Sequence, residues 1–178
     1  MNLSRKSVDL ALRQLDNFKK AIEDSSKSSV YKATQLLYEE IIKNCSDHKL
    51  SNYAGDIYID YDSNENVGRV HTNNMVIIFN EMGTGITGKN NPHPNVDDFF
   101  SGWEYDSNNH GEQGWWYPTD ENDPNPYKWR KKDTGELKGW TKGIASKRMF
   151  YDALQTVSNQ FGDIVKIEIE GRMGKIGD

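Results

Sequence analysis

The sequence contains a single cysteine, few hydrophobic residues and no excess of positive charge. Cys45 has no partner for an internal disulfide, and we find neither a signal peptide nor a long apolar run, so we expect a cytoplasmic chain that does not bind membranes. The formal net charge is -5, whereas a dedicated nucleic-acid-binding protein collects lysine and arginine to neutralise phosphates. Any contact with DNA is therefore expected to be transient. A hydrophobic share of 35% is low, which favours a subunit whose surfaces meet water or other chains.

The sequence also lacks a complete metal-binding or catalytic pattern. Its histidines do not form the close pairs typical of zinc sites, so we expect His93 and His110 to fix irregular loops through hydrogen bonds to the backbone. The segment Gly83–Lys89 has the glycine and lysine spacing of a phosphate-binding loop, but Asn90 replaces the hydroxyl residue that binds magnesium. Cys45 lies on the apolar stripe of a predicted helix and is expected in the core. We therefore predict no enzymatic activity, no cofactor, no catalytic residue and no metal.

Helical periodicity marks both ends of the chain. Apolar residues recur every three or four positions in residues 1–46, interrupted by a serine run, so we expect one bent helix or two, with Ser28 or Ser29 capping the second. A further helix is predicted over residues 145–161, closed by Gly162. The apolar positions of the first helical region are Val8, Leu12, Leu15, Phe18, Ile22, Val30, Leu37, Tyr38, Ile41 and Cys45.

The strands are predicted from a period of two. Residues 55–80 contain two alternating segments around a polar turn, and Met75–Asn80 follows as a third strand that is apolar on both faces. Residues 163–170 alternate again and predict a last strand with one buried face, in which Ile167 points inward. We expect a single α+β domain over residues 1–178, with N-terminal helices and a C-terminal helix packed on a small, mostly antiparallel sheet.

Residues 81–143 differ in composition from the rest of the chain. They contain all five prolines, all five tryptophans and most of the fifteen glycines. We expect a long loop insertion rich in Trp, Gly and Pro, which is ordered against a neighbouring subunit because disordered segments are poor in aromatics. Trp103 and Trp140 are expected to be buried. The expected interface residues are Trp115, Trp116, Tyr117, Trp129, Pro92, His93 and Pro94, and the residues expected to face passing DNA are Arg130, Lys131 and Lys132.

The tryptophans leave a second function open. Aromatic side chains also form platforms on which sugars or bases stack. The alternative to a structural subunit is therefore a carbohydrate-binding or hydrolytic protein that uses the Trp-rich loop as its cleft.

Five ordered blocks within the insertion carry a resemblance to a known family. The blocks are Glu81-Met82-Gly83-Thr84-Gly85-Ile86, Pro92-His93-Pro94, Gly102-Trp103-Glu104-Tyr105-Asp106, His110-Gly111-Glu112-Gln113-Gly114-Trp115-Trp116-Tyr117 and Gly139-Trp140-Thr141-Lys142-Gly143. Together they resemble the tail-completion, or tail-to-head joining, proteins of long-tailed bacteriophages and prophages of Gram-positive bacteria. The chain departs from that family at Ser51–Asp56, where members often have Thr-Gly-x-Leu-Arg, and at Ala145, where members often have proline. Residues 118–136 are also longer than is usual.

The resemblance implies a structural protein of the virion, located in the tail or neck and assembled in the host bacterial cytoplasm. It implies a small α+β fold that forms a homo-oligomeric ring, a hexamer, at the head-proximal end of the tail. The implied partners are the tail tube protein and the connector and stopper proteins of the head. Viral DNA would pass through the lumen of the ring.

Overall fold

The computed structural model describes residues 5–123 and 125–174, with the side chains of residues 5–8 and of residue 11 left out. Its contacts group into two compact units. The first comprises residues 1–44, 57–71 and 152–178, and the second comprises residues 45–56 and 72–151. Whether these units together make up the single domain expected from the chain length stays a prediction.

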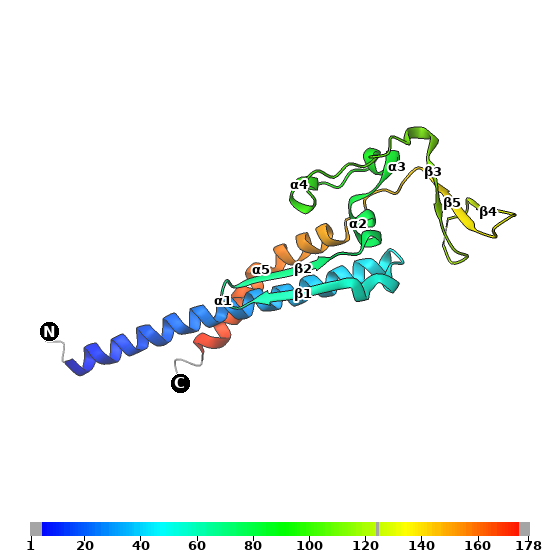
Figure 1. Cartoon of the computed structure of the whole chain (residues 1–178). Helices are drawn as coiled ribbons and strands as arrows, with labels where there is room; N and C mark the ends of the chain where they lie inside the picture. The colour runs from blue at the N-terminus through cyan, green and yellow to red at the C-terminus, as the bar shows by residue number, and fades with distance from the viewer. Residues whose placement is uncertain (1–4, 124, 175–178) are drawn as a thin grey trace. The chain divides into compact units, whose positions relative to one another are not determined.

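The first unit is built on two long helices and a hairpin. Helix α1 (Arg5–Asp47) and helix α5 (Met149–Met173) lie side by side, and the paired strands β1 (Ile57–Asp62) and β2 (Val67–Thr72) run along α1 (Figure 1). Strands joined by so short a turn pair antiparallel. The Tyr31 ring of α1 meets the Tyr61 ring of β1 edge to face, with ring centroids 5.4 Å apart. The α+β class predicted from the sequence is thereby confirmed.

The serine run lies inside one continuous helix and does not cap a second one. Ser25 and Ser29 are buried, and the Ser29 hydroxyl donates to the carbonyl of Ser25 at 2.7 Å. The Ser25 hydroxyl donates to the carbonyl of Glu168 in α5 at 3.2 Å. Small side chains are needed here because the α5 backbone approaches α1 closely, and a hydroxyl that bonds back to its own helix leaves no polar group unsatisfied. The N-cap expected at Ser28 or Ser29 was wrong.

The strand predicted over residues 163–170 was also wrong, because α5 continues through Gly162 to Met173. The half-buried positions in this part of the chain follow a helical repeat: Ile164, Val165, Glu168, Ile169, Arg172 and Met173. The alternation of Val165, Ile167 and Ile169 hid this repeat. Ile167, which was expected to point inward, has 63% of its surface exposed. Over so few residues, an apolar pattern fits both periods.

The third strand predicted at Met75–Asn80 is a helix, α2 (Met75–Met82). The side chain of Asn74 accepts a hydrogen bond from the Val76 amide at 2.8 Å and so caps the helix at its first turn. The residues that α2 buries are Ile77 and, three to five positions later, Asn80, Glu81 and Met82; the spacings of three and four place Ile77, Asn80 and Glu81 on one helical face. An apolar segment capped by Asn74 can bury one face without a sheet on either side.

The region expected as a long loop contains regular structure of its own. It includes the short helices α3 (Gly85–Asn90) and α4 (Val96–Phe99), and the 3-10 turns η1 (Ser51–Asp56) and η2 (Gly111–Gln113) lie before and within it. A three-stranded sheet follows, formed by β3 (Trp115–Pro118), β4 (Lys128–Arg130) and β5 (Leu137–Thr141). The central strand is β5, which pairs antiparallel with both neighbours (Figure 1).

Cys45 belongs to the core of the second unit, as the sequence predicts. Its side chain is fully buried, and its sulfur lies 3.7 Å from the sulfur of Met149 at the start of α5. Burial, with a smaller contribution from the negative charge of Glu81, raises the pKa of the Cys45 thiol to about 11. A thiol of this kind is a poor nucleophile near neutral pH.

Among the described residues, no helix is long and apolar enough to cross a membrane.

Candidate interaction site

The sequence blocks that carry the family resemblance come together in the second unit. The Gly-Thr-Gly segment after α2 runs beside the Lys142–Ile144 segment after β5. The Thr84 amide donates to the Ile144 carbonyl at 2.8 Å, and the Ile144 amide donates back to the Thr84 carbonyl at 3.1 Å. The indole nitrogen of Trp103 donates to the Gly83 carbonyl at 3.1 Å. Blocks about sixty residues apart in the chain therefore share one network of backbone hydrogen bonds.

The glycines of this segment serve a backbone crossing and not a phosphate site. Gly85 has φ of 62°, and a Cβ there would lie 2.8 Å from the Trp115 ring and would also collide with the Lys142 carbonyl. The backbone amides that a phosphate would need are already used: Gly85 donates to the Tyr105 carbonyl, Thr87 to Lys142 and Gly88 to Thr84. This arrangement supports the interpretation of a turn over that of a nucleotide loop.

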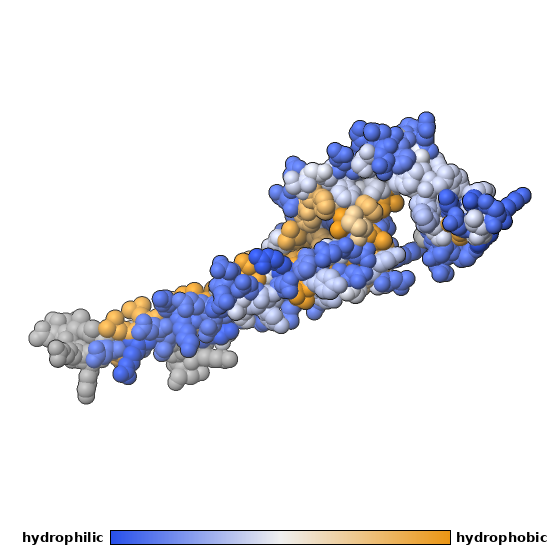
Figure 2. Space-filling model, viewed as in Figure 1, coloured by the Kyte–Doolittle hydropathy of each residue, from blue (hydrophilic) through white to orange (hydrophobic). Residues whose placement is uncertain are grey.

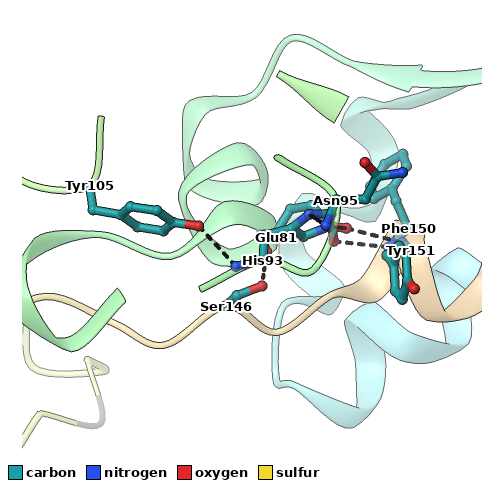
Figure 3. Close-up of polar contacts among 7 residues, drawn as sticks. All are labelled: Glu81, His93, Asn95, Tyr105, Ser146, Phe150 and Tyr151. Atoms are coloured by element: carbon teal, nitrogen blue, oxygen red, sulfur yellow. Dashed lines mark hydrogen bonds and ion pairs between the residues drawn. The ribbon is translucent and has the colours of Figure 1, made fainter. Parts of the chain in front are cut away.

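A buried carboxylate anchors these blocks to the start of α5. Glu81 lies in the last turn of α2 and is 5% exposed. Its Oε2 accepts the backbone amide of Phe150 at 2.9 Å, and its Oε1 accepts the amide of Tyr151 at 3.0 Å (Figure 3). The first amides of a helix have no partner within the helix, and a negative charge at this end is favourable. The hydroxyl of Ser146 donates to the Glu81 carbonyl at 2.5 Å.

His93 completes the buried network and does not lie on the surface of the second unit. It is 3% exposed, and its Nε2 lies 3.1 Å from Oε1 of Glu81 (Figure 3). Its backbone amide donates to the Tyr105 hydroxyl at 2.9 Å, and its Nδ1 accepts the Asn95 amide at 3.1 Å. Since Nδ1 accepts, Nε2 carries the proton and donates it to Glu81. His93 pins its loop, as the sequence predicts, while its neighbours Pro92 and Pro94 are exposed.

The Glu81 and His93 pair is enclosed by the fold. The side chain of His93 is fully buried and that of Glu81 is 6% exposed, so a substrate has no access to either. The rings of Phe99 and Tyr151 pack against the imidazole, with centroid distances of 4.8 Å and 5.4 Å. Each polar atom of the pair already has a partner within the fold, which leaves none to bind a reacting group.

A second carboxylate organises the loop before β3. The carboxylate of Asp106 accepts the amide of His110 at 2.9 Å and that of Gly111 at 2.8 Å. The hydrogen bond from Gly111 holds the pKa of Asp106 below its ordinary value, with a smaller contribution from His110. The His110 ring lies on the Trp115 ring, with centroids 4.9 Å apart. Trp115 is thus packed between His110 and Gly85, although it was expected to face a partner.

The sheet carries four aromatic side chains on one of its faces. In the antiparallel register Trp116 lies opposite Trp140, and Trp129 lies opposite Lys138, so these side chains project to the same side. Tyr127 precedes β4, and its ring meets the Trp140 ring edge to face at 6.0 Å. We call Trp116, Tyr127, Trp129 and Trp140 the aromatic face.

The aromatic face remains largely open to solvent. Trp116 is 52% exposed and Trp129 is 50% exposed, and their rings meet at 6.3 Å. Trp140 is half-buried, as is Trp103, although both were expected to be buried. Two of the predicted interface residues, Trp116 and Trp129, are therefore brought together on this surface. Tyr127 was missed because nothing in the sequence alone placed it opposite Trp140.

Tyr117 points to the opposite side of the sheet. Its ring lies across Gly139, where a Cβ would come within 2.6 Å of the ring. Its hydroxyl donates to Asp123 at 2.6 Å and accepts from the side chain of Asn125 at 3.0 Å. Burial, followed by the hydrogen bond to Asp123, raises the pKa of Tyr117. Tyr117 holds the β3–β4 connection against the sheet and is separated from the aromatic face.

The basic triplet is partly neutralised by nearby carboxylates, one in the β3–β4 connection and one in the β4–β5 turn. The guanidinium of Arg130 contacts the Glu121 carboxylate and donates to the Gly135 carbonyl at 2.7 Å. The ammonium of Lys131 lies 3.2 Å from the Asp133 carboxylate. Lys132 is exposed. With two of the three cations beside carboxylates, the triplet offers a weaker field to DNA than its sequence implies.

Comparisons with known proteins found no counterpart for this chain. No family model, no curated protein and no solved structure matches it. Among residues 5–123 and 125–174, no group of three or more histidine, cysteine, aspartate or glutamate side chains is arranged to hold a metal ion.

Proposed function

We propose that the chain is a structural subunit of a bacterial virus tail, which forms a ring at the head-proximal end of the tail tube and joins it to the connector of the head. The observation that carries this proposal is the aromatic face, an exposed cluster held on a sheet that the resembling sequence blocks build. Exposed tryptophan and tyrosine are enriched where proteins meet, since they bury much surface at a small entropic cost.

The hydrogen bonds among the resembling sequence blocks support an assembly role for the aromatic face. Glu81, His93 and the Gly-Thr-Gly crossing fix the blocks to one another by buried hydrogen bonds. A surface that is already ordered loses little conformational freedom when it meets a partner. The two exposed indoles, Trp116 and Trp129, are the proposed anchors for a neighbouring subunit or a neck protein.

The electrostatics suit a protein that contacts DNA in passing. The chain is acidic overall, and Arg130 and Lys131 lie beside Glu121 and Asp133. Such a surface does not hold phosphates tightly. We propose that Lys132, with its neighbours, faces the lumen of the ring.

Cryo-electron microscopy of tailed particles from the strain that encodes the chain tests this proposal. We expect a ring of density at the junction of head and tail into which the second unit fits. Particles without this chain, together with purified protein that is retained on a polysaccharide column, would contradict the proposal and favour a carbohydrate-binding protein. The two outcomes differ in which molecule the aromatic face contacts.

A further inference from the structure

The N-terminal part of α1 has an exposed apolar seam within the first unit. Leu12, Leu15, Phe18 and Ile22 are each between 41% and 63% exposed. Figure 2 shows hydrophobic residues open to solvent along this part of the helix. Scattered apolar side chains on a surface are normal, but a continuous row of large ones marks a contact site.

The seam follows the seven-residue repeat of a coiled coil. Leu15, Ile22 and Ser29 follow one another at intervals of seven residues. Phe18 and Ser25, which lie between them in the sequence, are also seven residues apart. The second of these series is shifted from the first by three positions, which is the relation of the two core positions of a heptad. A repeat of seven keeps one stripe of the helix facing a partner helix.

Farther along α1, the same row of residues already packs against a helix of this chain. At Ser25 the seam is occupied by helix α5, whose Glu168 carbonyl accepts from the Ser25 hydroxyl at 3.2 Å, and Ser29 beyond it is buried. Where this row of residues has a packing partner, that partner is a helix. Toward the N-terminus from Ile22 the same row changes from small polar to large apolar side chains and is exposed.

The opposite side of this part of α1 carries charged residues suited to solvent. Asp16 and Lys20 are four residues apart, with the acid nearer the N-terminus, and so are Glu23 and Lys27. This order of charges stabilises an isolated helix. The ammonium of Lys19 lies 3.9 Å from the carboxylate of Glu23. The helix has one charged side for solvent and one apolar side for a partner.

We propose that the seam pairs with the same seam of a second copy of this chain, with the two helices antiparallel. The positions beside the two core rows favour a second copy. Gln14 and Ala21 on one side are neutral, and on the other side Leu12, at the edge of the seam, faces Lys19 of the second copy, so no two acids or two bases meet. In the antiparallel pair, Leu15 of each copy lies against Phe18 of the other.

The antiparallel direction follows from the position of α5. In a parallel pair, both α5 helices, which reach each α1 at Ser25, would crowd the same end of the pair. In the antiparallel pair they lie at opposite ends, and a two-fold axis passes between Leu15 and Phe18. This pairing goes beyond the proposed function and does not rest on it, because it uses α1 and not the aromatic face.

Sedimentation of the full-length protein tests the pairing. From about 1 to about 100 μM, we expect the mass to rise from 20.4 kDa for one chain toward twice that value, with a Kd in the micromolar range. Leu15→Asp should raise that Kd at least tenfold while circular dichroism still reports a folded, helical protein. Leu10→Asp is the matched control, since Leu10 is equally exposed on α1 but lies off the seam, and it should leave the Kd unchanged.

Cross-linking tests the direction. The pairing brings position 14 of one copy beside position 21 of the other, so Gln14→Cys mixed with Ala21→Cys should form a disulfide faster than either variant alone. Cys45, being buried, should not interfere. A protein that stays monomeric at 100 μM, or an oligomer that Leu15→Asp leaves intact, would overturn the inference. Equal weakening by Leu10→Asp would overturn it too, and disulfides formed as fast by the single variants would overturn the antiparallel direction.

Discussion

The ring nitrogen Nε2 of His93 lies 3.1 Å from Oε1 of Glu81, and neither side chain has appreciable contact with solvent. The same carboxylate accepts the amides of Phe150 and Tyr151, which begin α5. One side chain therefore joins three segments of the chain: the end of α2, the His93 loop twelve residues later and the start of α5, about seventy residues later. The Ser146 hydroxyl also donates to the Glu81 carbonyl, which links this buried network to the segment that follows β5.

Glu81→Gln should lower the free energy of unfolding by about 2 to 4 kcal/mol. The carboxylate accepts hydrogen bonds from His93, Phe150 and Tyr151, and the NH₂ group of glutamine would place a donor against at least one of these donors. Urea denaturation measures the change. Glu112→Gln is the control, since the carboxylate of Glu112 is exposed beside Lys142, and it should change stability by less than about 0.5 kcal/mol. Equal effects of the two substitutions would remove Glu81 from the role assigned to it.

Gly85→Ala should destabilise the fold more than Gly102→Ala. Both glycines have positive φ, 62° and 78°, so alanine at either position costs about 1 kcal/mol of backbone strain. Gly102 has open space around its Cα, whereas a Cβ at Gly85 meets the Trp115 ring and the Lys142 carbonyl, and we expect a total loss of about 3 kcal/mol there. The shift in urea midpoint checks this, and a loss at Gly85 no larger than that at Gly102 would contradict the close crossing.

Cys45 should report on unfolding of the core. With a pKa near 11, about one thiol in a thousand is ionised at pH 8, and the side chain is fully buried. A thiol reagent should therefore label Cys45 at a rate that follows the opening of the protein and rises with urea. Ser46→Cys adds an exposed thiol one residue away, which should react within seconds in the folded protein. Rapid labelling of Cys45 in the absence of urea would show that this core is open.

Acid should weaken the loop that precedes β3. The amides of Gly111 and His110 lower the pKa of Asp106 below 3.8, so its carboxylate stabilises the fold above that pH, and this contribution is lost as the pH falls through the lower, folded value. Asp106→Asn should therefore reduce the stability lost between pH 5 and pH 3, as measured by urea denaturation at each pH. An unchanged pH dependence would mean that the two amides do not favour the ionised form.

The sequence allowed a sound prediction where a pattern was long. The helical repeat of α1 and the burial of Cys45 on it were predicted from a period sustained over many turns. The two strands of the hairpin are short, and the polar turn between them supported that prediction. The errors fell in short segments. The apolar composition of Met75–Asn80 fits a buried strand as well as a helix, and the N-cap at Asn74 favours the helix. Val165, Ile167 and Ile169 alternate, yet burial follows Ile164, Glu168 and Arg172 around a helix.

The candidate site was harder to predict because register cannot be read from composition. Trp115 and Trp116 are neighbours in sequence, but successive residues of a strand point to opposite faces, so one packs on Gly85 and the other joins the aromatic face. His93 was expected both to fix its loop and to lie among the interface residues. Its burial depends on Glu81, twelve residues earlier, and no local pattern links the two.

We propose that the aromatic face joins this chain to neighbouring proteins in a virus tail. The direct measurement is an electron-microscope count of joined particles in a lysate in which Trp116→Ser and Trp129→Ser replace the wild-type chain. Both indoles are half exposed, so the variant should remain folded, and Tyr58→Ser, which removes an exposed aromatic ring elsewhere, is the control. We predict filled heads and unjoined tails for the double variant and normal particles for the control. Normal, infectious particles from the double variant would contradict the account.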